Sequence, residues 1–397
     1  MNTKRHHPDA IPLDRAKTTP SSAGRPGAAP AGKTGRGTKG HKKPHDPDAA
    51  WGYKTSKNGE NELFYGYHGH AVVQVPEGHD HAGAEPRLIR RLELTPANED
   101  LVDVSLSLLR RIEHPAPKTL IADRAYHHKR PERWRDELAT RGIDAVLDLR
   151  ADEHGFTDLN HTRWAAGWPH CPATPDDLGT ISRPPSSPDS AAQQAFRNRI
   201  ATRQAYAFRR VTTPTKNGTA RWECPAIAGT VGCPLRPGTV EAAVELGLPV
   251  IQNPPDPNAP DFPTCCAQRT VTLDPGPLRK LMQRDYWGSD AWLREWNKRT
   301  YVEGAYGNLK NPSTENVRRG HFRVTGLPNV TIVAALAAAA YDRRILLNWA
   351  KHNKRTDPDH PLLRPAKNNQ VWNPIPTQHP ATPGEAPEAP HLVTDSP

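Results

Sequence analysis

The sequence has few aromatic and few hydrophobic residues for its length, and its apolar runs are short. Of 397 residues, 35% are hydrophobic and 6% are aromatic, while 43 are prolines. Such a chain cannot bury enough apolar surface along its whole length to offset the entropy of ordering it. We therefore predict a folded centre between two disordered termini, residues 1–45 and the proline-rich tail 353–397. For residues 1–45, a remnant of a first strand is the alternative.

The sequence also lacks the features of an exported or membrane-spanning chain. Its N-terminus has no apolar signal segment. Its most apolar stretch, Val330 to Trp349, is interrupted by Asp342, Arg343 and Arg344, which makes a membrane span unfavourable. We expect a cytoplasmic protein that acts away from the membrane.

The five cysteines are few, and none of them forms a C-x2-C pair. They are Cys171, Cys224, Cys233, Cys265 and Cys266. The spacing of eight residues between Cys224 and Cys233 is loose for a structural zinc site. The pattern favours reduced structural thiols over bound zinc.

Positive charge is abundant and is concentrated near the N-terminus. Residues 1–43 contain ten Lys and Arg residues against Asp9 and Asp14, which accounts for +8 of the net charge of +10. A basic arm of this kind suits a polyanion, and nucleic acid is the obvious one. A solvated basic leader is the alternative.

The ordered centre reads as alternating strands and helices. The patterns predict, in chain order, antiparallel strands 63–75 and 87–94, a helix over 98–112 capped by Asn98, a buried strand 120–122, a helix over 131–140 and a strand 145–147. The strand at 120–122 ends in Asp123. In an α/β fold the edge beyond the strand ends is the natural place for chemistry.

Residues 152–285 interrupt this order, and we interpret them as a largely irregular insertion. Within it the sequence predicts one helix over 191–202 and strand-like pieces at 239–244 and 270–273. Regular helices return at 289–311 and 329–349. The core would therefore comprise residues 46–151 and 286–352, separated by the insertion.

The helix beginning at Ser289 carries a charged stripe. Arg299, Glu303 and Lys310 are spaced by four and seven residues, so they share one face of a helix. A carboxylate between two bases suits a metal ion beside a phosphate. A solvated face with i,i+4 pairing is the plainer interpretation.

The string RTYVEGAYGNLK, from Arg299 to Lys310, resembles the Y-R-E-K signature of DDE-type insertion-sequence transposases. Leu120–Tyr126 (LIADRAY) resembles the strand that delivers the second catalytic Asp of that family. Gly66–His70 resembles the preceding strand, and Arg319-Gly320 with the Ala-rich helix resembles the C-terminal segment. The likeness spans about residues 46–349 in the right order.

This resemblance implies a ribonuclease-H-like mixed sheet flanked by helices, with an insertion between the second Asp and the Glu. It also implies metal-dependent DNA strand cleavage and strand transfer with two Mg²⁺ or Mn²⁺ ions. The implied catalytic and metal-binding residues are Asp123, Glu303 and Asp14. The implied DNA contacts are Arg299, Lys310, Tyr126 and Trp296. The partner would be double-stranded DNA, both element ends and target, bound by a homodimer. The resemblance also implies a bacterial protein associated with the nucleoid.

Three departures from the family pattern leave alternatives open. Trp296 stands where the signature has Tyr. The first Asp has only weak candidates: Asp14, then Asp46 or Asp48, or none. The helical end-binding domain expected before it is missing, which predicts an N-terminally truncated copy. The alternatives to a transposase are a catalytically dead DNA-binding remnant and a nuclease that hydrolyses without joining.

Overall fold

The computed structural model describes residues 5–14, 45–55, 61–76, 85–113, 116–123, 126, 130–159, 161–184, 190–318 and 323–355. For residues 5–14 it describes the backbone pairing alone. Most of the two predicted disordered termini, and Arg319-Gly320, lie outside these residues.

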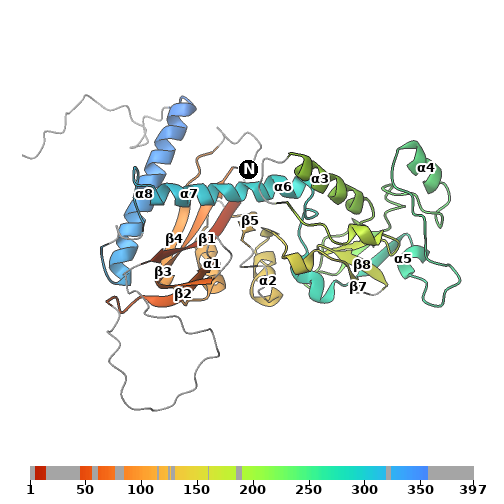
Figure 1. Ribbon diagram of the computed structural model, residues 1–397, viewed down its shortest axis with the longest axis horizontal. Coiled ribbons are helices and arrows are strands. Elements are labelled where there is room, and N and C mark those ends of the chain that lie inside the picture. The colour runs from red at the N-terminus through yellow and green to blue at the C-terminus, as the bar shows by residue number, and fades with distance from the viewer. Residues whose placement is uncertain are drawn as a thin grey trace, which may run out of the picture.

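A mixed six-stranded sheet forms one half of the molecule, to the left in Figure 1, and the insertion lies to its right. Its strands are β1 (Arg5–Asp14), β2 (Ala50–Thr55), β3 (Asn61–Val75), β4 (Ile89–Pro96), β5 (Thr119–Ala122) and β6 (Asp144–Leu147). The order is β2-β3-β1-β5-β6, with β4 paired to β3. β3 is antiparallel to β1, β2 and β4, whereas β5 is parallel to β1 and β6. The predicted pair of antiparallel strands, and the short strands at 120–122 and 145–147, are confirmed.

The position of β1 decides between the two interpretations of the N-terminus. Residues 5–14 pair with β3 on one side and β5 on the other, so this part of the expected arm is the remnant of a first strand rather than disordered. Pro8 and Pro12 cannot donate a backbone hydrogen bond to the ladder, and proline is uncommon in central strands. The basic residues 15–43 therefore follow the middle strand of the sheet, rather than preceding the fold.

Helices cover both faces of the sheet. On one face lie α1 (Leu101–Arg110), η2 (Pro131–Arg133) and α2 (Arg135–Ala139), packed on Leu120 and Ala122. On the other lie α6 (Asp290–Trp296), η6 (Asn297–Arg299), α7 (Thr300–Lys310) and α8 (Leu327–His352). α1 is capped by Asp100, whose side chain accepts from the Val102 amide at 2.8 Å, and not by the predicted cap Asn98.

The row α6-η6-α7 crosses the strands of the sheet in Figure 1. α6 contacts β6, η6 contacts β5, and α7 contacts β1 and β3, while α8 covers β4. The single helix predicted over 289–311 is thus two α-helices joined by a 3-10 turn. Val302, Ala305 and Leu309 face the core as predicted.

The insertion is folded around short elements, while more than half of its described residues lie in turns and loops, in keeping with the prediction that it is largely irregular. It contains two three-stranded sheets, β7 (Thr157–Leu159) with β8 (Thr162–Ala165) and β9 (Trp168–His170), and β10 (Arg209–Arg210) with β11 (Ala220–Glu223) and β12 (Thr270–Leu273). Its helices are α3 (Ser190–Ala205), α4 (Thr239–Glu245) and α5 (Thr264–Ala267), with 3-10 turns η3 (Ala151–Glu153), η4 (Asp176–Leu178) and η5 (Gly276–Leu281).

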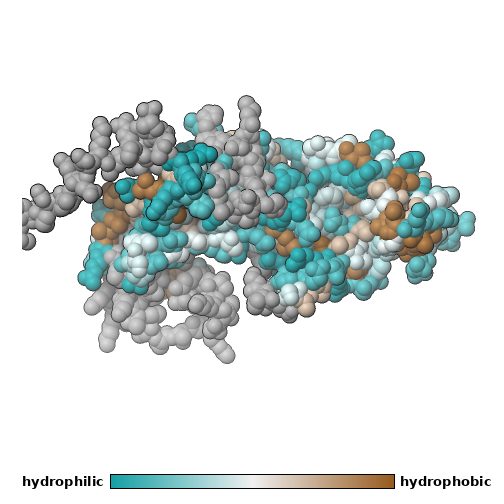
Figure 2. Space-filling view, turned by 90° about the horizontal axis from the view of Figure 1, so that it is seen from above, coloured by the Kyte–Doolittle hydropathy of each residue, from teal (hydrophilic) through white to brown (hydrophobic). Residues whose placement is uncertain are grey.

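Three of the insertion's elements compare directly with the sequence. The helix over 191–202 is confirmed as α3 and the strand at 270–273 as β12, whereas 239–244, predicted as strand-like, is the helix α4. In Figure 2 the visible face is mostly hydrophilic, and hydrophobic patches gather toward the end that holds α4. Val244 and Leu246 there are 67% and 70% exposed. None of the helices in the described ranges is long and apolar enough to cross a membrane.

Candidate active site

Asp123 lies immediately beyond β5, at the edge where the parallel strands end, and it is exposed. The two faces of β5 are distinct. Leu120 and Ala122 pack toward α1 and α2, and Ile121 packs in the cluster that contains Trp292 and Trp296 of α6. Continued alternation along the strand would direct residue 123 to the Ile121 side, the face that α6, η6 and α7 cover.

Glu303 projects from the flank of α7 and forms an ion pair with Arg299. The Arg299 Nη1 to Glu303 Oε1 distance is 2.7 Å, and the two side chains are 28% and 50% exposed. The guanidinium also lies 5.2 Å from the centre of the Trp296 ring. Since η6 contacts β5, this pair sits on the helix segment next to the strand that ends before Asp123. Lys310, at the end of α7, is exposed.

Two of the predicted DNA contacts are buried. Tyr126 is 2% exposed, its hydroxyl lies 2.7 Å from Ser105 Oγ, and its ring stacks on Trp134. Trp296 is 4% exposed and stacks on Trp292 with 5.3 Å between ring centres. Both rings have core partners, so this geometry favours a supporting role beneath the surface over direct contact with DNA.

Asp46 and Asp48 accept hydrogen bonds from amides at the start of α8, and this capping role explains both carboxylates without a bound metal. Asp46 is 2% exposed and accepts from the Tyr67 hydroxyl at 2.8 Å and from the Gly326 amide at 3.1 Å. Asp48 accepts from the Leu327 amide at 2.9 Å. These bonds satisfy amide groups at the N-terminus of a helix, where carboxylates are favoured.

The register of β1 gives the backbone positions of its two aspartates. Asp9 pairs with Ala71, which packs against α7, and Asp14 pairs with Gly66, five residues farther along β3. In the parallel pairing His6 is level with Leu120, so position 9 is level with position 123. Asp14 lies five residues farther along β1 than Asp9, so its backbone is about 17 Å beyond the level of Asp123, at roughly 3.3 Å per residue.

Asp148, directly after β6, is a carboxylate that the sequence reading missed. The β5-β6 register places it beside Asp123 at the same edge of the sheet. It is 1% exposed, accepts from Arg183 Nη2 at 2.7 Å, and accepts from the Trp287 indole at 3.1 Å. Its partners fix it within the core, and a buried, paired carboxylate of this kind organises structure.

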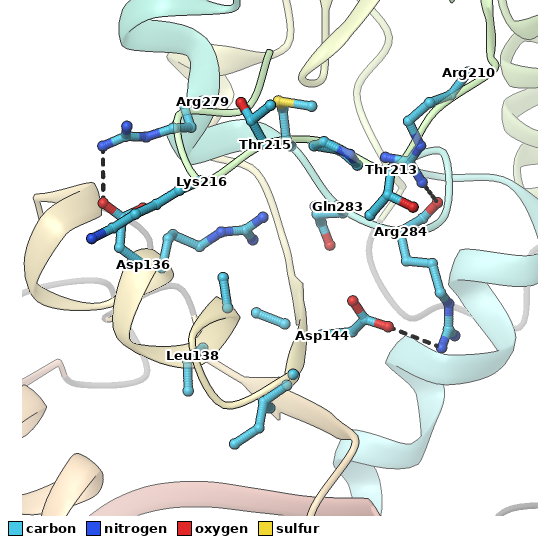
Figure 3. Close-up of a pocket in the computed structure, with 18 residues that line it drawn as sticks. Asp136, Leu138, Asp144, Arg210, Thr213, Thr215, Lys216, Arg279, Gln283 and Arg284 are labelled. Carbon is cyan, nitrogen blue, oxygen red and sulfur yellow. Dashed lines mark hydrogen bonds and ion pairs between the residues drawn. The ribbon is translucent and has the colours of Figure 1, made fainter. Parts of the chain in front are cut away.

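A basic pocket of about 380 Å³ opens at the other end of β6 (Figure 3). Five cationic side chains line it against two carboxylates: Arg135, Arg210, Lys216, Arg279 and Arg284, with Asp136 and Asp144. Burial lowers the pKa of Arg135 to about 10, and its Nη1 is buried without a hydrogen-bond partner. The excess of positive charge suits an anionic ligand.

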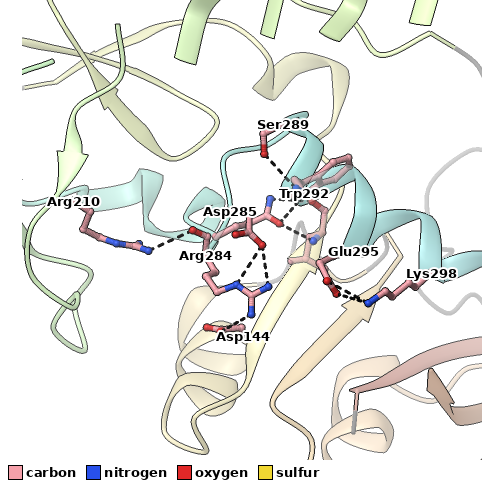
Figure 4. Close-up of polar contacts among 10 residues, drawn as sticks. Asp144, Arg210, Arg284, Asp285, Ser289, Trp292, Glu295 and Lys298 are labelled. Carbon is pink, nitrogen blue, oxygen red and sulfur yellow. Dashed lines mark hydrogen bonds and ion pairs between the residues drawn. The ribbon is translucent and has the colours of Figure 1, made fainter. Parts of the chain in front are cut away.

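Figure 4 shows how the pocket connects to α6. Arg284 bridges Asp285 at 3.0 Å and Asp144 at 3.5 Å, and its carbonyl accepts from Arg210. Farther along, Lys298 of η6 lies 3.3 Å from Glu295. The pocket and the Asp123 edge are therefore at opposite ends of neighbouring parallel strands, about 13 Å apart along a four-residue strand.

Among the side chains that the structure describes, no three His, Cys, Asp or Glu residues stand together in a ready-made metal site. The exposed acids of the candidate site are Asp123 and Glu303. The third carboxylate of the expected set would come from β1, whose side chains lie outside the description.

Comparison with known proteins gives a match over one part of the chain. A family model described as the transposase DDE domain matches residues 29–225. This match covers about half of the chain, including Asp123, Asp46 and Asp48, and leaves out β1 and α7. No curated protein and no solved structure matches. Similarity to a transposase DDE domain is thus established for residues 29–225, and the roles of Glu303 and of the β1 aspartates rest on the arguments below.

Proposed function

We propose that this chain is a DNA transposase that cleaves and joins DNA strands with divalent metal ions at the edge of the sheet marked by Asp123. The observation that carries the proposal is the DDE-domain match across the strand that ends at Asp123, together with the Arg299–Glu303 helix crossing the neighbouring face. The strand order β3-β1-β5-β6, antiparallel and then parallel, supports a ribonuclease-H-like sheet.

The donors fit hard divalent cations, because carboxylate oxygens are the ligands that Mg²⁺ and Mn²⁺ prefer. Asp123, Glu303 and one aspartate of β1 would hold them, and the bound ions would activate the attacking hydroxyl and stabilise the leaving oxygen. Arg299 would orient Glu303 through its ion pair and present a cation to a phosphate. The basic pocket, with five cationic side chains against two carboxylates, would bind a part of the DNA backbone that lies at some distance from the reacting phosphate.

The register favours Asp9 over Asp14 as the β1 ligand. Position 9 is level with position 123, and it pairs with Ala71 on the face that α7 covers. Position 14 pairs with Gly66, which belongs to the alternate set of β3 residues that includes Val72. Val72 packs toward α1, on the opposite face. We therefore assign the third carboxylate to Asp9 and retain Asp14 as the alternative.

The test is metal-dependent nicking of DNA that carries the ends of the element. Asp123→Asn and Glu303→Gln should each lower the nicking rate at least about a thousandfold, because members of one metal site fail together. Both variants keep the shape of the native side chain, so retained DNA binding should accompany the loss. Asp9→Asn should match them and Asp14→Asn should not.

Different outcomes separate the alternatives. Nicking that depends on Asp14 and tolerates Asp9→Asn would return the third ligand to Asp14. A wild-type chain that binds DNA without nicking it in Mg²⁺ or Mn²⁺ would identify a catalytically dead remnant. Nicking without strand joining would identify a nuclease. Full activity in Asp123→Asn would remove the proposed site altogether.

A further inference from the structure

A second cationic pocket, besides the basic pocket at the other end of β6, opens between the insertion and the core. It is a groove of about 490 Å³. One wall is α3 of the insertion with the segment before it, and the other is α6, which lies beside α3 in Figure 1. The polar side chains that line this α3–α6 groove are Arg183, Gln193, Arg197, Asp290, Arg294 and Asn297.

Arg183 places the α3–α6 groove beside the candidate site. Its Nη2 donates to Asp148 Oδ2 at 2.7 Å, and residue 148 is level with Asp123 on the neighbouring strand. Neighbouring strands are about 4.8 Å apart. The guanidinium carbons of Arg183 and Arg299 lie 5.6 and 5.2 Å from the centre of the Trp296 ring, so they are at most about 11 Å apart. The groove and the candidate site therefore share the end of the sheet where β5 and β6 finish.

The other two cations of the groove are exposed, and they have no charged partner among the described residues. Arg197 belongs to α3 and Arg294 to α6, and neither side chain forms a hydrogen bond or an ion pair within those residues. α3 contains no Asp or Glu, and Asp290 supplies the one carboxylate that the structure places in the groove. Two unpaired arginines on opposite walls of one groove repel each other weakly, and an anion bound between them removes this repulsion.

The chemistry of the lining favours phosphate. A guanidinium presents a planar set of N–H donors that matches a phosphate, often through two parallel hydrogen bonds. Gln193 and Asn297 add side-chain amides, and amides of this kind also donate to phosphate oxygens. Because the groove is open to solvent and lies next to the proposed site of DNA cleavage, the phosphate that it fits best belongs to a DNA backbone.

We propose that the α3–α6 groove binds the phosphate backbone of the DNA strand that is cut, within a few nucleotides of the reacting phosphate. The inference rests on the proposed function, which brings that strand to the Asp123 edge. Arg197 and Arg294 would each bind a phosphate, from opposite walls. Arg183, whose charge is engaged by Asp148, would hold the wall of the groove in place. The insertion thus contributes to substrate binding next to the metal site.

The first test is DNA binding by the full-length chain without divalent metal, measured by fluorescence anisotropy over a range of salt concentrations. Each arginine that binds a phosphate adds about 0.9 to the slope of log K against log salt, so the double variant Arg197→Gln, Arg294→Gln should lose about 2 from that slope. Arg199→Gln is the matched control and should keep the wild-type slope. Arg199 is also exposed on α3, but it donates to the Asp177 carbonyl and does not line the groove.

The second test locates the contacts with methylphosphonates, which replace one charged phosphate by a neutral group. The probes are duplexes that carry an element end, each with one methylphosphonate at a successive position around the cleavage point. At one or two positions within a few nucleotides of that point, the neutral group should weaken wild-type binding about tenfold. The same group should have little further effect in the double variant, because its protein partner is already absent.

Two results would overturn the inference: an unchanged salt slope in a double variant that unfolds thermally like the wild type, or equal methylphosphonate effects in wild type and variant at every position. Neither result depends on nicking, so the groove can fail while metal-dependent nicking, and with it the proposed function, stands. A wild-type chain that fails to nick but shows the coupled phosphates would overturn the proposed chemistry while still showing that the groove binds the DNA backbone.

Discussion

The central sheet and the insertion are stabilised in different ways. The sheet has long strands that pair over many residues, β1 with β3 from Arg5 to Asp14 for example, and helices that bury alternate side chains on each face. The insertion has strands of two to four residues and a core rich in tryptophan and cysteine. Regular strand pairing stabilises the sheet, and the clustering of buried side chains stabilises the insertion.

This difference explains how far the sequence could predict the fold. Strand alternation and helical spacing mark β3, β4, β5, β6 and α8, and each was located to within a few residues. Short strands such as β10 have no periodicity to detect. The turn at η6 also escaped notice, because Asn297, Lys298 and Arg299 are all compatible with a continuous helix.

The residues of the candidate site could be predicted where they belong to a sequence motif. They could not be predicted where their position depends on how the strands pair. Asp123 and Glu303 came from strings that resemble a family. The β1 aspartates could not be ranked, since the sequence alone does not say which residue lies level with Asp123. Asp46 and Asp48 looked like candidate ligands because a helix-capping carboxylate and a metal-binding one have the same residue type.

Removing β1 should be the most damaging change to the sheet, and removing the basic segment beside it one of the mildest. A chain lacking residues 1–14 loses the strand between β3 and β5, so we expect loss of the cooperative unfolding transition. A chain in which a short Gly-Ser linker replaces residues 15–43 should keep that transition. Circular dichroism during thermal unfolding measures both.

The linker variant should bind DNA more weakly and with less dependence on salt. Residues 15–43 contain eight Lys and Arg residues and no Asp or Glu. If most of them contact phosphate, the slope of log K against log salt should fall by several units. An unchanged slope would mean that these residues are a passive leader. A folded chain without residues 1–14 would contradict the position of β1.

Acid should destabilise the insertion more than the sheet. Burial lowers the pKa of His170 in β9 to about 3, with Arg203 and Arg163 adding to the effect, and it lowers the pKa of His70 in β3 to about 4. Each imidazole takes up a proton near pH 6.5 only when the chain unfolds, so stability falls as the pH drops below that value. By pH 5 each histidine accounts for about 2 kcal/mol of lost stability.

The sheet has a compensating group, Asp342 of α8. Burial raises its pKa to about 6, although the hydrogen bond from the Ile89 amide and the charge of Arg90 both lower it. The native carboxyl therefore takes up a proton before the unfolded one, and stability rises as the pH falls from about 6 to 4, by about 1 kcal/mol at pH 5. The lowered pKa of His68 acts in the opposite direction. The Asp342 carboxyl therefore offsets part of the loss that His70 and His68 cause in the sheet.

Hydrogen exchange followed by peptide at about pH 7 and pH 5, corrected for intrinsic rates, measures this difference. Protection should fall first in peptides of the insertion. His170→Gln should reduce that loss, and Asp342→Asn should make the sheet more sensitive to acid. An equal loss of protection everywhere would mean that the two regions unfold as one unit.

The smallest predicted effect concerns Asp48, and it separates a structural carboxylate from a catalytic one. Its Oδ2 accepts from the Leu327 amide at the start of α8, so Asp48→Ala should cost about 1 kcal/mol of stability. Asparagine also caps helices well, so Asp48→Asn should cost only the charge interaction with the helix dipole, about 0.5 kcal/mol. Denaturant unfolding gives both values. If Asp48 only caps α8, nicking should survive in Asp48→Asn, while Asp123→Asn abolishes it at unchanged stability. Loss of nicking in folded Asp48→Asn would place this carboxylate among the metal ligands and move the candidate site toward the start of α8.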